Sequence, residues 1–135
     1  VDKGGNEVFS PSLILQHNGR RIGVFGVMVA MVTSKMKTQV ASSYLWSNPI
    51  ERAIEVAKQL RPEVDDLFAL THIGFTQDQK LAEACPEIDV IFGGHSHTVL
   101  DTPARVHQTW IAQGGSHGRF FGLYDWDGEV LTGGL

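Results

Sequence analysis

Short apolar runs alternate with segments of helical periodicity along most of this chain. The run at 21–29 is almost continuously apolar, which predicts a strand inside a sheet and covered on both faces. Two further strands are predicted at 67–72 and 89–92. The intervening segments 49–60 and 76–85 repeat apolar residues every three or four positions, as helices do. Successive strand–helix–strand units predict parallel strands with right-handed crossovers, and therefore an α/β fold.

Local signals mark where several elements begin. Asn48 followed by Pro49 predicts a capped helix start, and Thr76 predicts the start of the second helix. Asn18 and Gly19 are a strong signal for a hairpin turn ahead of the first long strand. Further strands are expected at 13–16, 109–112 and 120–126, and an irregular loop at 30–46.

The bulk composition restricts the class of protein. The 135 residues, 42% of them apolar and 19% charged, fit one globular domain. A net charge of −4 without a Lys/Arg cluster argues against a nucleic-acid-binding surface. The longest apolar run, 22–32, is too short to cross a bilayer, so no transmembrane segment is expected in this chain. The single cysteine, Cys85, excludes an intrachain disulfide and is expected to be buried. Because the chain starts at Val1 without a signal-type segment, we expect a fragment of a longer protein.

Three histidines follow the ends of neighbouring predicted strands. His72 ends one strand, and His95 and His97 come just after the next strand and the glycines Gly93 and Gly94. The carboxyl ends of parallel strands meet at one edge of a sheet, where ligands usually bind. In an extended backbone, alternate side chains share a face, so the last two histidines are expected to point the same way. Imidazole is a common ligand of zinc, manganese and iron, and the pattern therefore predicts a metal site.

The other polar residues are interpreted as ordinary surface groups, and no convincing Asp stands at a strand end to bridge two ions. His117 can reach the same sheet edge but is interpreted as a loop residue. Solvation is also expected for His17 and His107, and for Asp78 and Glu83 on the solvent face of a helix. The pair Asp65 and Asp66 is expected to cap or solvate the start of a strand.

The segments 70–74, 88–98 and 111–115 resemble those of the calcineurin-like metallophosphoesterases, most closely the bacterial 5'-nucleotidase branch. The most specific part is Gly-Gly-His-Ser-His, and the similarity covers nearly the whole chain. It implies that residues 1–135 form the C-terminal part of a four-layer α/β/β/α sandwich with two divalent ions, such as Zn, Mn or Fe. By this resemblance, His72 and His95 would bind one ion and His97 the other.

The family's N-terminal motifs Asp-x-His, Gly-Asp-x-x-Asp and Gly-Asn-His have no counterpart in this chain. They carry the bridging Asp and the catalytic His, so the resemblance implies no catalytic residue here and places those groups upstream. It leaves the substrate-binding residues unknown. For the intact protein it implies hydrolysis of a phosphomonoester by a metal-bound hydroxide, with a small phosphorylated substrate such as a nucleotide. Family members are often periplasmic or extracellular. This chain alone is expected to be inactive or weakly active.

Several alternatives stay open. A related phosphodiesterase or a sulfur-compound hydrolase would use the same half-site. A non-catalytic metal-binding or degenerate interaction domain would have lost the upstream ligands, and a purely structural role would need no metal. A metallo-hydrolase of the His-x-His-x-Asp-His type is disfavoured, because Asp101 is displaced and no histidine follows it.

Overall fold

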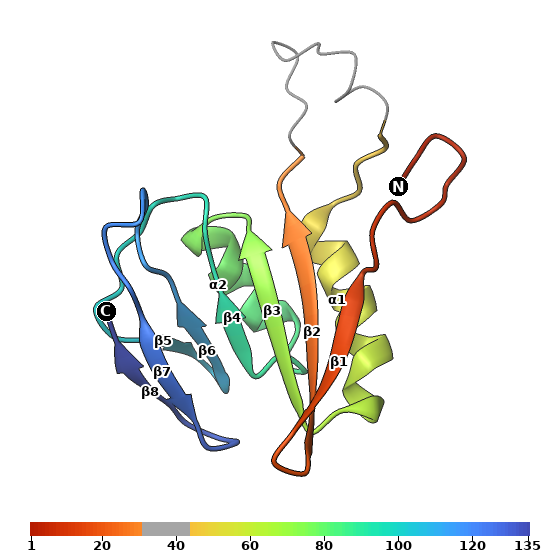
Figure 1. Ribbon diagram of the computed structural model, residues 1–135. Coiled ribbons are helices and arrows are strands. Elements are labelled where there is room, and N and C mark those ends of the chain that lie inside the picture. The colour runs from red at the N-terminus through yellow and green to blue at the C-terminus, as the bar shows by residue number, and fades with distance from the viewer. Residues whose placement is uncertain (31–43) are drawn as a thin grey trace.

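A computed structural model describes residues 1–30 and 44–135. The expected loop at 30–46 falls mostly outside these ranges. The described part contains a six-stranded mixed sheet, two α-helices and a two-stranded sheet (Figure 1). The elements are β1 (Ser12–His17), β2 (Arg20–Met28), α1 (Pro49–Leu60), the 3-10 helix η2 (Arg61–Glu63), β3 (Asp66–His72), α2 (Phe75–Ala84), β4 (Val90–Phe92), β5 (Ala104–Val106), β6 (Thr109–Ala112), β7 (Leu123–Trp126) and β8 (Leu131–Gly134).

The larger sheet has the strand order β1-β2-β3-β4-β6-β5. The four central strands are mutually parallel, and β1 and β5 are antiparallel to their neighbours. The predicted α/β class and the parallel β2-β3-β4 arrangement are therefore confirmed. Because the central strands run the same way, the ends of β3 and β4 lie at one edge of the sheet, where the candidate histidines follow.

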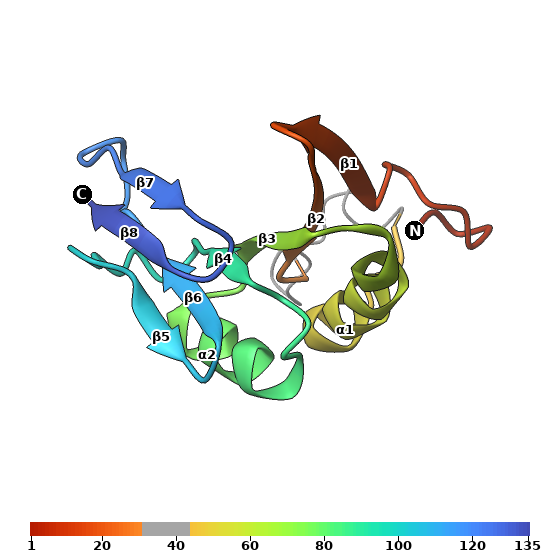
Figure 2. The same cartoon turned by 90° about the horizontal axis from the view of Figure 1, so that it is seen from below.

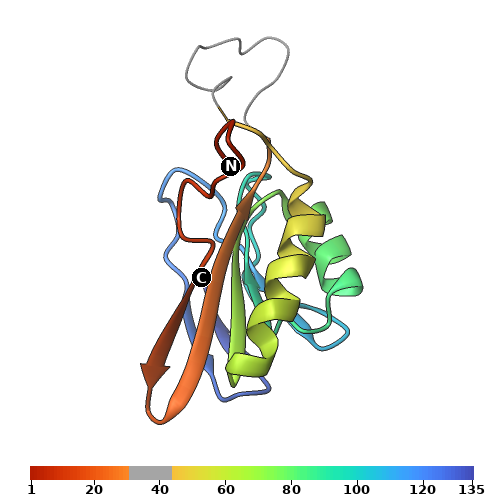
Figure 3. The same ribbon diagram turned by 90° about the vertical axis from the view of Figure 1, so that its right-hand side faces the viewer.

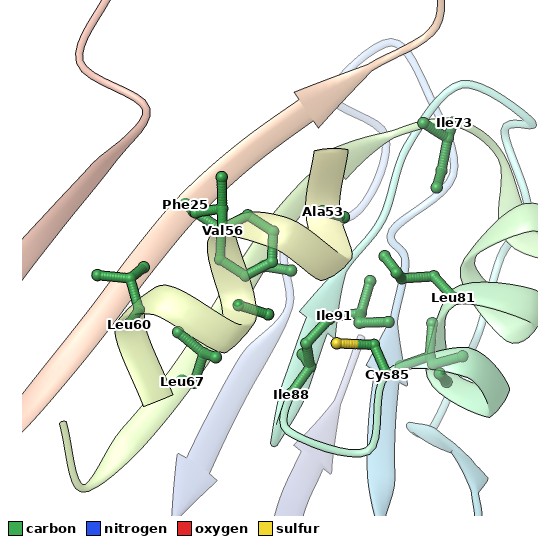
Figure 4. Packing of buried hydrophobic residues seen from close by; sticks show 14 residues of the cluster. Phe25, Ala53, Val56, Leu60, Leu67, Ile73, Leu81, Cys85, Ile88 and Ile91 are labelled. Carbon is green, nitrogen blue, oxygen red and sulfur yellow. The ribbon is translucent and has the colours of Figure 1, made fainter. Parts of the chain in front are cut away.

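Two layers cover opposite faces of this sheet. Both helices lie on one face, and the β7–β8 hairpin lies on the other (Figures 2 and 3). Between helices and sheet, fully buried residues such as Leu67, Leu81 and Ile91 form the main core, and Cys85 is buried with them as expected (Figure 4). A smaller cluster around Val90 packs under the hairpin.

The expectation that the strand at 21–29 is covered on both faces is wrong. Phe25 points into the helix-side core and is 2% exposed, whereas Met28 is 43% exposed. One face of β2 stays uncovered because the β7–β8 hairpin packs on other strands. Its apolar residues contact side chains of β3, β4 and β6, such as Phe68 and Phe92. The neighbouring part of that face, on β1, β2 and β3, keeps apolar side chains in contact with solvent.

The two helix starts differ in how well the sequence predicted them. Asn48 caps α1 as expected, and its Oδ1 accepts hydrogen bonds from the backbone N–H groups of residues 50 and 51 at 2.9 and 3.4 Å. Thr76 is not a cap, because α2 begins one residue earlier, after Gly74 at φ 91°. The N–H of Phe75 instead donates to Ser96 Oγ at 3.0 Å. This cap therefore comes from the histidine-bearing loop.

Asp66, which is expected to cap or solvate the start of its strand, is buried instead, with 1% of its surface exposed. It accepts hydrogen bonds from Arg20 Nε at 2.7 Å and from Trp126 Nε1 at 2.8 Å. The bond from the Arg20 guanidinium is the main cause of the lowered pKa of this carboxyl group. This one side chain thus links β2, β3 and β7, which joins the hairpin to the sheet.

The last third of the chain contains two strands that the pattern did not predict. These are the short strands β5 and β8, while β7 covers only the final part of the expected strand 120–126. Short edge strands with few residues give little alternation to detect. No helix in the described ranges is both long and apolar enough to span a membrane.

Candidate metal centre

His72 and His95 meet at the carboxyl edge of the parallel strands. His72 is the last residue of β3, and His95 comes three residues after β4. Their atoms His72 Nε2 and His95 Nδ1 are 3.4 Å apart, and their ring centroids are 5.0 Å apart. Two nitrogen ligands of a tetrahedral zinc ion, each about 2.1 Å from the metal, stand roughly 3.4 Å from one another. This imidazole pair therefore fits two ligand positions of a single ion.

His97 lies beside a different histidine from the one that His95 meets. Both residues lie in the left-handed region, with φ 58° for His97 and 78° for His95, so the extended backbone assumed from the sequence is wrong. The ring of His97 packs against His117, with centroids 5.6 Å apart. The structure thus brings four histidines to this edge as two pairs. His117, for which the sequence predicts a plain loop residue, belongs to the second pair.

Gly94 allows the histidine-bearing turn to approach β3. A Cβ atom added at Gly94 would lie 3.0 Å from His72 Nδ1 and 3.4 Å from the carbonyl oxygen of Thr71. Glycine at this position therefore avoids a close contact between a Cβ atom and the imidazole of His72.

Ser96 fixes the same turn from three sides. Its hydroxyl accepts from the N–H of Phe75, donates to Gln113 Oε1 at 3.2 Å and lies 2.9 Å from Thr98 Oγ1. These contacts connect the turn to α2 and to the end of β6. The site is therefore built on elements of the core rather than on one isolated loop.

Comparisons with known proteins identify the family of this chain. No protein-family model matches the chain. The trifunctional nucleotide phosphoesterase protein YfkN of Bacillus subtilis (strain 168) is 32% identical over an alignment of 120 residues that covers 85% of this chain and 8% of that protein. The uncharacterized metallophosphoesterase YunD of the same organism is 30% identical over 132 residues, covering 92% of this chain and 27% of that protein. Other relatives are named 5'-nucleotidase and apyrase. This chain belongs to the calcineurin-like metallophosphoesterases, in the 5'-nucleotidase branch.

A solved structure shares the fold of this chain. The sulfate thiohydrolase SoxB of Thermus thermophilus superposes with a TM-score of 0.81 and 27% identity, covering 98% of this chain and 26% of that one. The chain thus spans about a quarter or less of the length of the relatives named here.

For a metallophosphoesterase, the ligand set in this chain is partial. Within residues 1–30 and 44–135, no three or more His, Cys, Asp or Glu side chains are close enough together to hold a metal ion. The imidazole pairs fit the nitrogen part of such a site. The carboxylates that would complete it are not contributed by the described residues around these histidines.

Asp78 lies beneath the histidine turn. The prediction that it lies on the solvent face of its helix is wrong. It is fully buried, and its Oδ1 accepts a hydrogen bond from Thr71 Oγ1 at 2.6 Å. Its Oδ2 is buried and has no hydrogen-bond partner among the described residues. Burial raises the pKa of Asp78 from 3.8 to about 6. Glu83 on the same helix is exposed as expected, and so are His17 and His107.

Proposed function

We propose that this chain supplies the imidazole half of a two-metal phosphoester hydrolase. His72 and His95 would bind one divalent ion, and His97 would bind the other. The observation that carries the proposal is the 3.4 Å separation of His72 Nε2 and His95 Nδ1 at the carboxyl edge of the parallel strands. It is supported by relatives named as nucleotide phosphoesterase, 5'-nucleotidase and apyrase.

The proposed substrate is a nucleotide phosphomonoester. The proposed reaction is hydrolysis, because this is the chemistry that two bound divalent ions would assist. Divalent ions at such a site make bound water acidic and neutralise the charge of a phosphoryl group. The residues of this chain hold and orient the ions. The glycines at 93 and 94 keep the turn close to β3, and Ser96 anchors it to α2. The catalytic acid–base groups would come from the upstream part of the protein.

Replacing His72 or His95 by alanine is expected to weaken zinc binding by at least about tenfold, because each change removes one of two chelating nitrogens. Isothermal titration of the metal-free chain with Zn²⁺ measures this. In the longest protein that carries this chain, both variants should also lose manganese-dependent phosphate release from adenosine monophosphate. His17→Ala is the matched control, since His17 is an exposed histidine at the end of β1. Equal zinc affinity in all four proteins would contradict the proposal.

A second candidate reaction is hydrolysis of a sulfur compound. It is favoured by the likeness to the sulfate thiohydrolase SoxB, at 27% identity over 98% of this chain. The same metal-ligand histidines would serve either reaction. Parallel assays of phosphate release from a nucleotide and sulfate release from an S-sulfonated thiol separate the two reactions.

The uncovered part of the sheet bears on the domain organisation. Four exposed apolar side chains lie on β1, β2 and β3, and we call them the open face: Leu13, Leu15, Met28 and Leu70. A contiguous apolar surface of this kind normally marks a contact. An apolar groove lined in part by Met28 and Leu70 continues from it to His72. We propose that the other sheet of a four-layer α/β/β/α sandwich, contributed by the upstream part of the same protein, covers the open face. The chain would then be the C-terminal part of one domain.

Leu70→Lys is expected to reduce binding of an apolar dye by the isolated chain, since the side chain is 53% exposed on the open face. In the longer protein the same change should lower the free energy of unfolding by about 2 kcal/mol or more, because it would bury a charge. Dye fluorescence and urea unfolding measure the two effects. Leu123→Lys is the control, since Leu123 is 70% exposed on β7. The same effect from both variants in the longer protein would contradict the covering.

A further inference from the structure

His117 stands opposite His97 although the two residues are far apart on the chain. Their ring centroids are 5.6 Å apart, with planes inclined at 76°. The pair of His72 and His95 has almost the same arrangement, with 5.0 Å between centroids and 69° between planes. The sheet edge thus carries two imidazole pairs of similar geometry.

Backbone pairing holds His117 in this place. Val99 and Gly114 form an antiparallel bridge. On either side of it, the N–H of Leu100 donates to the carbonyl of Gln113 at 3.0 Å, and the N–H of Gly115 donates to the carbonyl of Thr98 at 2.9 Å. The two loops are therefore joined by backbone hydrogen bonds that begin next to His97 and end two residues before His117.

A neighbouring hydroxyl group engages one ring nitrogen of His117. Its Nδ1 is 2.9 Å from Ser116 Oγ, which leaves Nε2 as the free nitrogen. A hydrogen bond to one ring nitrogen commonly fixes the tautomer and orientation of a ligating histidine. The ring is exposed, so an ion can reach it.

The spacing of the pair also suits a shared ion. An imidazole centroid lies about 3 Å from a metal ion that the ring binds, so two ligands of one ion have centroids roughly 4.5–6 Å apart. The 5.6 Å between His97 and His117 falls in this range. Both residues lie in the left-handed region, at φ 58° and 61°. This conformation is uncommon for residues other than glycine.

We propose that His97 and His117 are both ligands of the second divalent ion, so that each ion of the site takes two imidazoles from this chain. The proposal rests on the proposed function, which assigns only His97 to that ion. It adds a ligand from the loop after β6 and makes this loop part of the metal centre.

The test is a Zn²⁺ titration of the full, metal-free chain by calorimetry, with circular dichroism to verify folding before metal is added. We expect His117→Ala and His97→Ala each to weaken one class of site by at least about tenfold. The double variant should weaken it no further, because either change already breaks the pair. The control is His107→Ala, since His107 is also exposed and also left-handed, at φ 53°, but lies in the turn between β5 and β6. It should bind zinc as the unchanged chain does.

A second measurement covers the case that a variant does not fold. Addition of Ni²⁺ to the unchanged chain should broaden the ring-proton NMR signals of His97 and His117 together, at a lower concentration than that of His107. Zinc binding by a folded His117→Ala variant equal to that of the control would overturn the proposal, as would unequal broadening of the pair. The proposed function survives that result if His72→Ala still weakens zinc binding. It fails separately if His72→Ala and His95→Ala have no effect.

Discussion

Asp78→Asn is expected to remove a fall in stability that the unchanged chain shows as the pH rises from about 4 to about 7. Burial raises the pKa of Asp78 from 3.8 to about 6, so the folded chain keeps a proton that the unfolded chain has already released. Between these values the unfolded state binds fewer protons than the folded state, and stability therefore falls as pH rises. Above about pH 7, where Asp78 has lost its proton in both states, the full cost is present, on the order of 3 kcal/mol. Asparagine has no such titration and keeps an oxygen for Thr71.

Urea unfolding at several pH values measures this effect. The quantity to compare is the unfolding free energy of Asp78→Asn minus that of the unchanged chain, which should grow by about 2–2.5 kcal/mol between pH 4 and pH 7.5. Taking this difference cancels the titration of all other groups. Glu83→Gln is the control, because Glu83 lies on the same helix but is exposed. A difference for Asp78→Asn that stays constant with pH would show that the carboxyl group titrates as in the unfolded chain.

The position of Asp78 was detectable in the sequence. Residues 78, 81, 82 and 85 follow the spacing that places side chains on one face of a helix, and the last three are buried. The polarity of a carboxylate predicts a solvent-facing position, whereas its place in this stripe predicts a buried one. Periodicity was the better guide here, because Thr71 on β3 offers the buried oxygen a hydrogen bond. The burial of Asp66 is also not predicted from its local sequence. Its hydrogen-bond partners Arg20 and Trp126 are 46 and 60 residues away along the chain.

The candidate site was predictable as far as it depends on strand direction. Parallel strands place the ends of β3 and β4 together, and this brought His72 and His95 to one edge. The orientation of His97 depends on a left-handed backbone that no periodicity encodes. The place of His117 depends on pairing between residues 98–100 and 113–115 after β6. Such non-local pairing is set by the packed fold, so a local pattern does not reveal it.

Gly93→Ala is expected to destabilise the chain by about 1–3 kcal/mol, the usual cost of overpacking a core. A Cβ atom at Gly93 would overlap Asp78 Oδ2 and lie 3.3 Å from Asp78 Cγ. The backbone cannot simply retreat, because the N–H of Gly93 donates to the carbonyl of Ala112 at 2.8 Å. The carboxylate cannot retreat either, since it is fully buried and hydrogen-bonded to Thr71. Thermal or urea unfolding measures the loss.

A double-mutant cycle identifies the cause of that loss. If the overlap with Asp78 dominates, Gly93→Ala should cost much less in an Asp78→Ala background, with a coupling energy of about 1 kcal/mol or more. Gly26→Ala is the control, because a Cβ there would meet only the carbonyl oxygen of Leu70, at 3.8 Å. Additive losses in the cycle would mean that the cost arises in the turn itself. Strong coupling would mean that the glycine before the histidines is required by the buried carboxylate beneath them, so that packing inside the core sets the path of the chain into the metal site.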